Sequence, residues 1–204
     1  MASPLFTLKH GISLVLASGS PRRKEFLESW GIPFTCRPVA GEPDPVAGES
    51  AAAFVSRCAE YKLAHGQQGP CELVIAADTV VALDDKIMGK PCDENEALSM
   101  LMSLSGHVHQ VMTATSISFP DKTVASTCSV CHVHMPDWDR ETLRAYVATG
   151  ESMDKAGAYA IQGKGAFLID RIDGSWSTVV GLPVSWLARE LAAKGMLYPA
   201  QSSC

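Results

Sequence analysis

Residues 18–24, Ser-Gly-Ser-Pro-Arg-Arg-Lys, combine small and cationic side chains in a pattern that suits anion binding. Ser20 is a preferred helix N-cap residue and Pro21 a preferred first helical residue, so a helix should begin here. The unpaired N–H groups of a helix N-terminus carry partial positive charge, which makes three cations in the first turn unfavourable unless an anion binds there. We therefore predict anion binding by Ser18, Ser20, Arg22 and Arg23, with a solvated basic surface as the alternative.

Asp78 interrupts an otherwise apolar run, from Leu73 to Leu83, together with the adjacent Thr79. A carboxylate in such surroundings is costly unless it is paired, hydrogen-bonded or bound to a metal. Acids in apolar settings are often general bases or metal ligands. The alternative is that the strand ends at Asp78, which then caps a turn, and the residues alone leave both interpretations open.

Three lysines stand where a lysine is not expected from the local pattern. Lys62 falls on the apolar stripe of a helix, four residues after Cys58, whereas Lys90 and Lys155 follow or precede glycines in loops. Each is weak evidence alone, because lysine stems often lie over apolar surface. Together with the two arginines they could line one cleft and neutralise a triphosphate during metal-assisted attack on phosphorus.

Residues 154–163, Asp-Lys-Ala-Gly-Ala-Tyr-Ala-Ile-Gln-Gly, form a fourth candidate segment. Its glycines allow close approach of the backbone to a ligand. Tyr159 offers a ring, and Gln162 offers both a donor and an acceptor to the edge of a base. The physical chemistry alone favours the alternative, an ordinary connecting loop with the tyrosine packed in the core.

Helices and strands alternate in a way that predicts an α/β domain with a mixed sheet. We expect strands at 14–17, 73–83, 86–88, 108–119, 124–135 and 166–172, and helices at about 21–31, 50–66, 97–104, 140–150 and 183–195. The stretch 37–50 is expected to be loop, and the tail after Tyr198 to be frayed.

The composition limits the class of protein. The chain has 204 residues, 47% of them hydrophobic, and a formal net charge of −5. An acidic balance disfavours non-specific binding to nucleic acid or to an anionic membrane. No apolar run approaches the ~20 residues of a membrane span. Seven cysteines without a signal-peptide pattern indicate reduced thiols in a cytoplasmic protein.

Two further patterns are interpreted as structural. Cys128, Cys131 and His132 match the spacing of a haem-attachment motif, but strand alternation puts the two cysteines on opposite faces, so we expect neither haem nor zinc there. Met100 and Met102 lie in a short helix with several leucines and are expected to fill the core.

Several segments together resemble the Maf family, in order from Leu14 to about Lys194. They are Ser-Gly-Ser-Pro-Arg-Arg at 18–23, Ala-Ala-Asp-Thr-Val-Val at 76–81, Gly-Lys-Pro at 89–91, Leu-Ser-Gly at 104–106, the 154–163 segment and Gly-Leu-Pro at 181–183. The resemblance implies one domain over residues 1–204, ordered over about 12–196. It also implies the Maf/inosine-triphosphatase-like fold, an elongated mixed sheet with two lobes around a cleft.

The resemblance further implies hydrolysis of a nucleoside triphosphate to the monophosphate and pyrophosphate. It assigns proton acceptance to Asp78 and a divalent metal, usually magnesium, to the reaction. We expect Lys90 to be catalytic as well, and Asp78 and Glu42 to bind the metal, with manganese as the alternative to magnesium. The resemblance ties Arg22, Thr79 and Gln162 to substrate choice. From their chemistry we expect Ser18, Ser20, Arg23, Lys62 and Lys155 to bind the substrate as well. The 154–163 segment resembles the branch acting on dTTP and UTP, although Ala160 stands where the family usually has glycine.

The resemblance also implies a homodimer, because the family is often dimeric. Two other functions stay open at this point. One is an inosine or xanthosine triphosphatase on the same general fold. The other is a non-catalytic, nucleotide-binding regulator of cell division, which the presence of the acid, the cations and the glutamine argues against.

Overall fold

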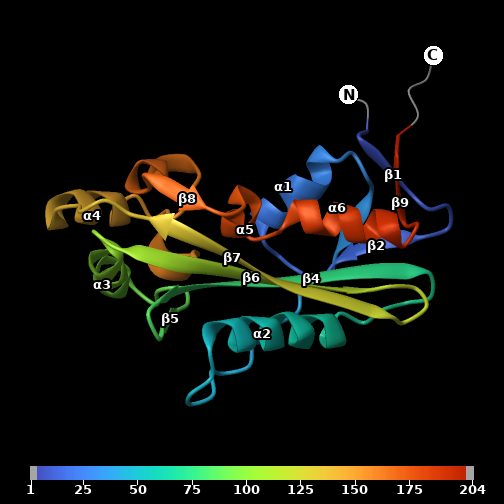
Figure 1. Ribbon diagram of the computed structural model, residues 1–204, viewed down its shortest axis with the longest axis horizontal. Helices are drawn as coiled ribbons and strands as arrows, with labels where there is room; N and C mark the ends of the chain where they lie inside the picture. Colours follow the sequence, from blue (N-terminus) through green and yellow to red (C-terminus); the bar gives the residue numbers. More distant parts are fainter. Residues whose placement is uncertain (1–3, 201–204) are drawn as a thin grey trace.

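The computed structural model describes residues 4–200, and its framework is one mixed sheet of seven strands (Figure 1). The strand order is β3-β2-β4-β6-β7-β8, with β5 also paired to β4. These strands are β2 (Ser13–Leu16), β3 (Phe34–Cys36), β4 (Glu72–Leu83), β5 (Lys86–Met88), β6 (Val108–Ser118), β7 (Val124–His134) and β8 (Arg171–Asp173). Strands β3, β2 and β4 run parallel, and the remaining pairs are antiparallel, so the expected mixed sheet is confirmed.

Helices cover both faces of this sheet. Figure 1 shows α1 (Pro21–Ser29), α5 (Trp176–Val180) and α6 (Val184–Ala193) on one face and α2 (Ala51–His65) on the other. At one end of the sheet lie α3 (Glu94–Leu104), α4 (Arg140–Val147) and the 3₁₀ turns η1 (Ala156–Ala158) and η2 (Gly163–Leu168). A second sheet pairs β1 (Phe6–Leu8) with β9 (Leu197–Pro199).

Two large apolar clusters form the cores of two lobes. One lies around α1, α6 and the parallel strands and contains Leu16, Leu27 and Leu187, all fully buried. The other lies around α3 and α4 and contains Leu101 and Leu143, also fully buried. Because β4 and β6 contribute side chains to both clusters, the sheet joins the lobes into one unit.

Strand β4 continues through Asp78, so the alternative in which the strand ends there is wrong. Antiparallel pairing with β6 runs unbroken from Val74 to Ala82. That ladder binds the backbone of Asp78 whatever its side chain does, because ladder hydrogen bonds involve main-chain groups only. The carboxylate must therefore be satisfied by neighbours from other elements.

The segment expected as a strand at 166–172 begins as a 3₁₀ turn and becomes a strand only at its end. Residues 163–168 form η2, and only Arg171–Asp173 pair with β7. Gly163 has a φ of 69°, a conformation that favours glycine and turns the chain out of an extended path. Apolar residues in this stretch fill the core around α4 without strand pairing.

Three other elements escape the sequence patterns, namely the β1–β9 sheet, β3 and α5. The expected fraying after Tyr198 is wrong up to residue 200, since Tyr198 pairs with Thr7 and Ala200 N–H donates to Leu5 C=O. The rest of that tail lies outside the described residues. These pairs join the two ends of the chain, and no local pattern encodes such a long-range contact.

The patterns interpreted as structural are largely confirmed. Cys131 is buried in the α3 and α4 cluster, whereas Cys128 packs against the cluster under α2, so the two thiols lie on opposite faces of the sheet. Met100 is buried, but Met102 is 38% exposed and does not fill the core as expected. No helix within residues 4–200 has the length and apolar character needed to cross a membrane.

The position of α3 generates a stability prediction. Leu101→Ala should lower the free energy of unfolding by about 2–5 kcal/mol, because it leaves a cavity in the core. Met102→Ala, on the exposed face of the same helix, should change it by less than about 0.5 kcal/mol. Urea denaturation of both variants measures the difference, and equal losses would contradict this placement of α3.

Candidate functional site

An interruption along one edge of β4 creates the candidate site. On that edge β2 pairs with β4 only as far as Ile75, and β5 pairs with it only from Val81. Between these two points β4 has, among the described residues, a strand neighbour on its β6 side only. Side chains of consecutive strand residues point to opposite faces, so Asp78 and Thr79 face different sides of the sheet. The open edge lets both reach one cavity.

That cavity has a volume of about 860 Å³ and lies beyond the carboxyl ends of the parallel strands β2 and β3. The helices that follow these two strands, α1 and α2, lie on opposite faces of the sheet (Figure 1), the arrangement in which open α/β sheets bind ligands. All the site residues predicted from the sequence line it: Ser18, Ser20, Arg22, Arg23, Glu42, Lys62, Asp78, Thr79, Lys90, Lys155 and Gln162.

On the α2 side, two carboxylates converge on one ammonium group. Lys62 Nζ lies 2.5 Å from Asp78 Oδ1 and 2.5 Å from Glu42 Oε1. The side chains of Lys62 and Asp78 are each only 10% exposed, whereas that of Glu42 is 52% exposed. Lys62 thus lies on the apolar face of its helix because its charge is offset by a buried acid.

The loop carrying Glu42 is fixed to α2 by a second ion pair. Arg57 donates to both carboxylate oxygens of Glu49 and to the carbonyl of Asp44. The Arg57 guanidinium and the Val46 N–H lower the pKa of Glu49 to about 2. These contacts hold the loop close to the cavity and so bring Glu42 within reach of Lys62.

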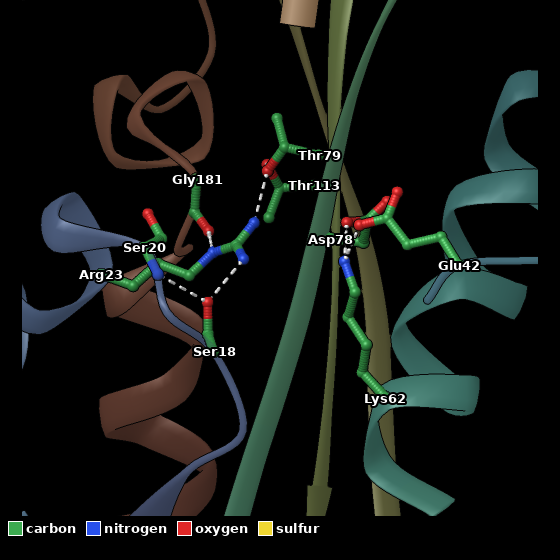
Figure 2. Close-up of polar contacts among 9 residues, drawn as sticks. All are labelled: Ser18, Ser20, Arg23, Glu42, Lys62, Asp78, Thr79, Thr113 and Gly181. Carbon is green, nitrogen blue, oxygen red and sulfur yellow. Dashed lines mark hydrogen bonds and ion pairs between the residues drawn. The ribbon is translucent and has the colours of Figure 1, made fainter. Parts of the chain in front are cut away.

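On the other side of β4, the buried Arg23 joins three distant segments. Its Nε donates to Gly181 C=O (2.7 Å), Nη1 to Ser18 Oγ (3.0 Å) and Nη2 to Thr79 Oγ1 (3.1 Å). Burial lowers the pKa of Arg23, and the nearby Asp78 carboxylate opposes that shift. Figure 2 shows Arg23 directed at Thr79 and Asp78 directed away, toward Lys62 and Glu42.

The two arginines of the 18–24 turn therefore have different surroundings. Arg23 directs its guanidinium at protein acceptors, which makes it an organiser of the cavity wall. Arg22 is only half-buried and its recorded hydrogen bond is a 3.3 Å contact from Nε to Val180 C=O. At the start of α1, Ser18 Oγ accepts the N–H of Ser20, and the Ser20 side chain makes no capping hydrogen bond.

The 154–163 segment reaches β4 through a tight turn at η1. Gly157 has a φ of 68°, and a Cβ there would lie 2.9 Å from Val81 Cγ2, so both conformation and close approach require glycine. Its N–H donates to Gly89 C=O, which places Lys155 and Lys90 on the same rim of the cavity. Lys155 is half-buried and bonded to Asp154, whereas Lys90 is exposed.

Tyr159 matches the alternative that places it in the core. It is 5% exposed, and its hydroxyl is 2.8 Å from Nε2 of the buried His109. Burial lowers the pKa of His109 to about 4, so this imidazole is neutral near pH 7. Gln162, by contrast, is half-buried at the cavity wall.

Sequence reasoning missed Thr113, which lies opposite Thr79 in the β4–β6 register and contacts its hydroxyl. A threonine on a buried strand face is common, and only the tertiary contact marks it out. The carbonyls of residues 178, 180 and 181, which accept from Thr113, Arg22 and Arg23, were also missed because backbone acceptors leave no sequence signal.

The oxygen donors at this site fit a hard divalent cation. Asp78 and Glu42 already direct one oxygen each at a common cationic centre, the Lys62 ammonium. Within residues 4–200 no three His, Cys, Asp or Glu side chains form a complete metal cage. Magnesium is commonly bound by one or two carboxylates, with substrate phosphates and water as the other ligands, so two carboxylates suffice.

Comparisons with known proteins agree with one another. The family model described as "Maf-like protein" matches residues 13–194. A protein of Oleidesulfovibrio alaskensis named dTTP/UTP pyrophosphatase is 51% identical over 92% of this chain and 87% of its own length. A protein of the same name from Nitratidesulfovibrio vulgaris is 49% identical over 95% of this chain and 92% of its own length.

Among solved structures, a nucleoside-triphosphatase (dITP/XTP pyrophosphatase) from Mycobacterium abscessus overlaps with a TM-score of 0.41. The two chains are 17% identical, and the overlap covers 90% of this chain and 94% of the other. An overlap of this extent carries no argument about fold or function.

The ion pair between Lys62 and Asp78 predicts strong coupling in a double-mutant cycle. Lys62→Met leaves the buried Asp78 carboxylate without this ammonium and should lower the free energy of unfolding by about 3 kcal/mol. Adding Asp78→Asn should recover part of that loss. Lys90→Met, at an exposed position of the same cavity, is the matched control. Denaturant unfolding at pH 7 measures the two single variants, the double variant and the control. Additive losses in the double variant would exclude the pair as a stabilising contact.

Proposed function

This chain belongs to the Maf family, and on that premise we propose that it hydrolyses dTTP and UTP to the monophosphate and pyrophosphate. The reaction makes it a hydrolase acting on acid anhydrides. The activity for which relatives at 49–51% identity over nearly the whole chain are named supports this proposal. The observation that carries it is structural: a buried acid and cations from distant segments line one cavity.

In the proposed reaction Asp78 accepts a proton from a water molecule. The water oxygen attacks the α-phosphorus, the bond from that phosphorus to the bridging oxygen breaks, and pyrophosphate leaves in line. Asp78 suits this role because its carboxylate lines the cavity and its side chain is 10% exposed. Buried, positioned carboxylates act as general bases when they lie within hydrogen-bond reach of the water.

Cations on the cavity wall are proposed to bind the phosphates. Arg22, Lys90 and Lys155 are the candidates, because the first two form no ion pair with any residue from 4 to 200 and Lys155 is paired with a largely exposed acid. Phosphate oxygens would also compete with Asp78 and Glu42 for Lys62. Arg23 is proposed to act indirectly, by holding Ser18 and Thr79 in place.

Nucleoside triphosphate pyrophosphatases generally use a divalent metal. We propose magnesium, with manganese as a substitute, and Asp78 and Glu42 as its protein ligands. A bound divalent cation offsets phosphate charge and makes a coordinated water more acidic. Thr79 and Gln162 are proposed to contact the base, since both are half-buried at the cavity wall.

Further proposals concern the whole protein. We propose that residues 1–204 form a single domain, supported by the one sheet that joins both cores. A cytoplasmic location and a homodimer are proposed as well. The cytoplasmic location rests on the sequence patterns, and the homodimer rests on the family resemblance.

The decisive test is a panel of triphosphates with pyrophosphate detection. The purified chain with magnesium should hydrolyse dTTP and UTP in preference to ITP, XTP and ATP, and EDTA should abolish the reaction. A preference for ITP or XTP would instead favour a purine triphosphatase. Binding without hydrolysis under magnesium or manganese would favour a non-catalytic regulator.

Substitution of the acid tests its role in proton transfer. Asp78→Asn should lower turnover of UTP at least ~100-fold, the lower range for loss of a general base. Asp85→Asn makes the same change at the exposed β4–β5 turn and should leave turnover unaltered. Steady-state kinetics measure both, and near-normal turnover by Asp78→Asn would remove Asp78 from this role.

A further inference from the structure

Thr113 lies directly behind Thr79, the threonine that faces the cavity. The two residues are opposite each other in the β4–β6 register, and Thr113 is 0% exposed. Thr79 is half-buried and lines the cavity, which Thr113 does not. Thr113 therefore has no direct contact with the cavity, and its hydroxyl is linked to the cavity through Thr79.

The hydrogen positions in this pair are fixed by their neighbours. Thr113 Oγ1 lies 2.7 Å from Thr178 C=O, and a carbonyl only accepts, so the Thr113 hydrogen points there. Thr113 Oγ1 is thus an acceptor toward Thr79 Oγ1, 2.9 Å away. It follows that the Thr79 hydroxyl donates to Thr113.

Arg23 removes the remaining ambiguity at Thr79. A guanidinium has no acceptor, so Arg23 Nη2 donates to Thr79 Oγ1 over 3.1 Å. One hydrogen and one lone pair of the Thr79 hydroxyl are thereby used inside the protein. The lone pair that remains can only accept. Figure 2 shows the three side chains meeting on the side of β4 opposite Asp78.

Pyrimidine bases differ in what they offer to such an acceptor. Uracil and thymine carry a hydrogen on the ring nitrogen between their two carbonyls, whereas the equivalent nitrogen of cytosine is an acceptor. A hydroxyl that can only accept forms a hydrogen bond with the imide N–H of uracil or thymine. With cytosine it faces the lone pair of the equivalent ring nitrogen, and no hydrogen bond forms between them. A site built for one hydrogen-bonding partner strongly rejects an analogue lacking it, because buried polar groups are left unpaired.

From this arrangement we infer that Thr113 is a positioning residue that sets base preference by orienting the Thr79 hydroxyl as an acceptor. The ligand class is a nucleotide whose base carries an imide N–H. This inference rests on the proposed function, because it assumes a pyrimidine nucleotide in the cavity with its base at Thr79.

The test measures binding, so that it is independent of catalysis. Dissociation constants of the non-hydrolysable α,β-methylene analogues of UTP and CTP are determined by calorimetry with magnesium. Thr113→Val removes the acceptor behind Thr79 and frees its hydrogen to turn toward the cavity. The preference for the UTP analogue should fall at least ~10-fold, with binding of the CTP analogue unchanged or tighter.

Two variants control for packing. Thr115→Val makes the same change two residues along β6, at a fully buried hydroxyl with no hydrogen-bond partner within the described residues. Thr113→Ser keeps the hydroxyl. Both should retain the wild-type preference. A purely structural role for Thr113 predicts that Thr113→Val weakens both analogues equally, and that result would overturn the inference.

A measurement on the unaltered protein covers the case in which Thr113→Val does not fold. N3-methyl-UTP has lost the imide hydrogen, whereas 5-methyl-UTP keeps it and carries a methyl group of equal size. As competitors of the UTP analogue, N3-methyl-UTP should bind at least ~10-fold more weakly than 5-methyl-UTP. Equal binding would overturn the inference. Absence of hydrolysis in the substrate panel would instead refute the proposed function, while these affinities still report on Thr79.

Discussion

The structure depends on a buried ion pair placed where the sheet has an open edge. Asp78 lies in the middle of a twelve-residue strand, yet its carboxylate is held by Lys62 from α2. A charge at this depth in a continuous sheet would lack both water and partners. The space between the end of β2 and the start of β5 removes that conflict, and it also forms the cavity.

The same open edge divides the polar contacts of the site into two centres. On the α2 face the ammonium and two carboxylates form a charged centre suited to a cation and phosphates. On the α1 and α5 face Arg23 links the 18–24 turn, β4 and the α5–α6 corner through hydrogen bonds. One centre can exchange its partners, because Glu42 and the cavity are open to solvent. The other is joined by hydrogen bonds from the buried Arg23, and Thr79 faces the cavity from it.

Local charge, and not net charge, governs what this acidic protein can bind. The chain carries a formal net charge of −5, but cations from α1, α2, the β5–α3 loop and the η1 turn line one cavity. Each lobe contributes part of this set, and β4 and β6 connect them. A polyanion bound between the lobes would therefore contact both, so its binding would also stabilise their relative position.

The sequence by itself determined the long β4, the starting residues of α1 and α2 and the mixed sheet, and its motifs identified residues that the structure places along the cavity. These follow from apolar runs, N-cap residues and ordered motifs, which are local signals. Only the tertiary structure decided the different surroundings of Arg22 and Arg23, the burial of Tyr159 against His109, and the contact between Thr113 and Thr79. The β1–β9 pair and η2 were likewise decided there. The reason is physical: hydrogen bonds to backbone carbonyls and contacts between residues as far apart as Arg23 and Gly181 depend on long-range packing, which short-range patterns do not encode.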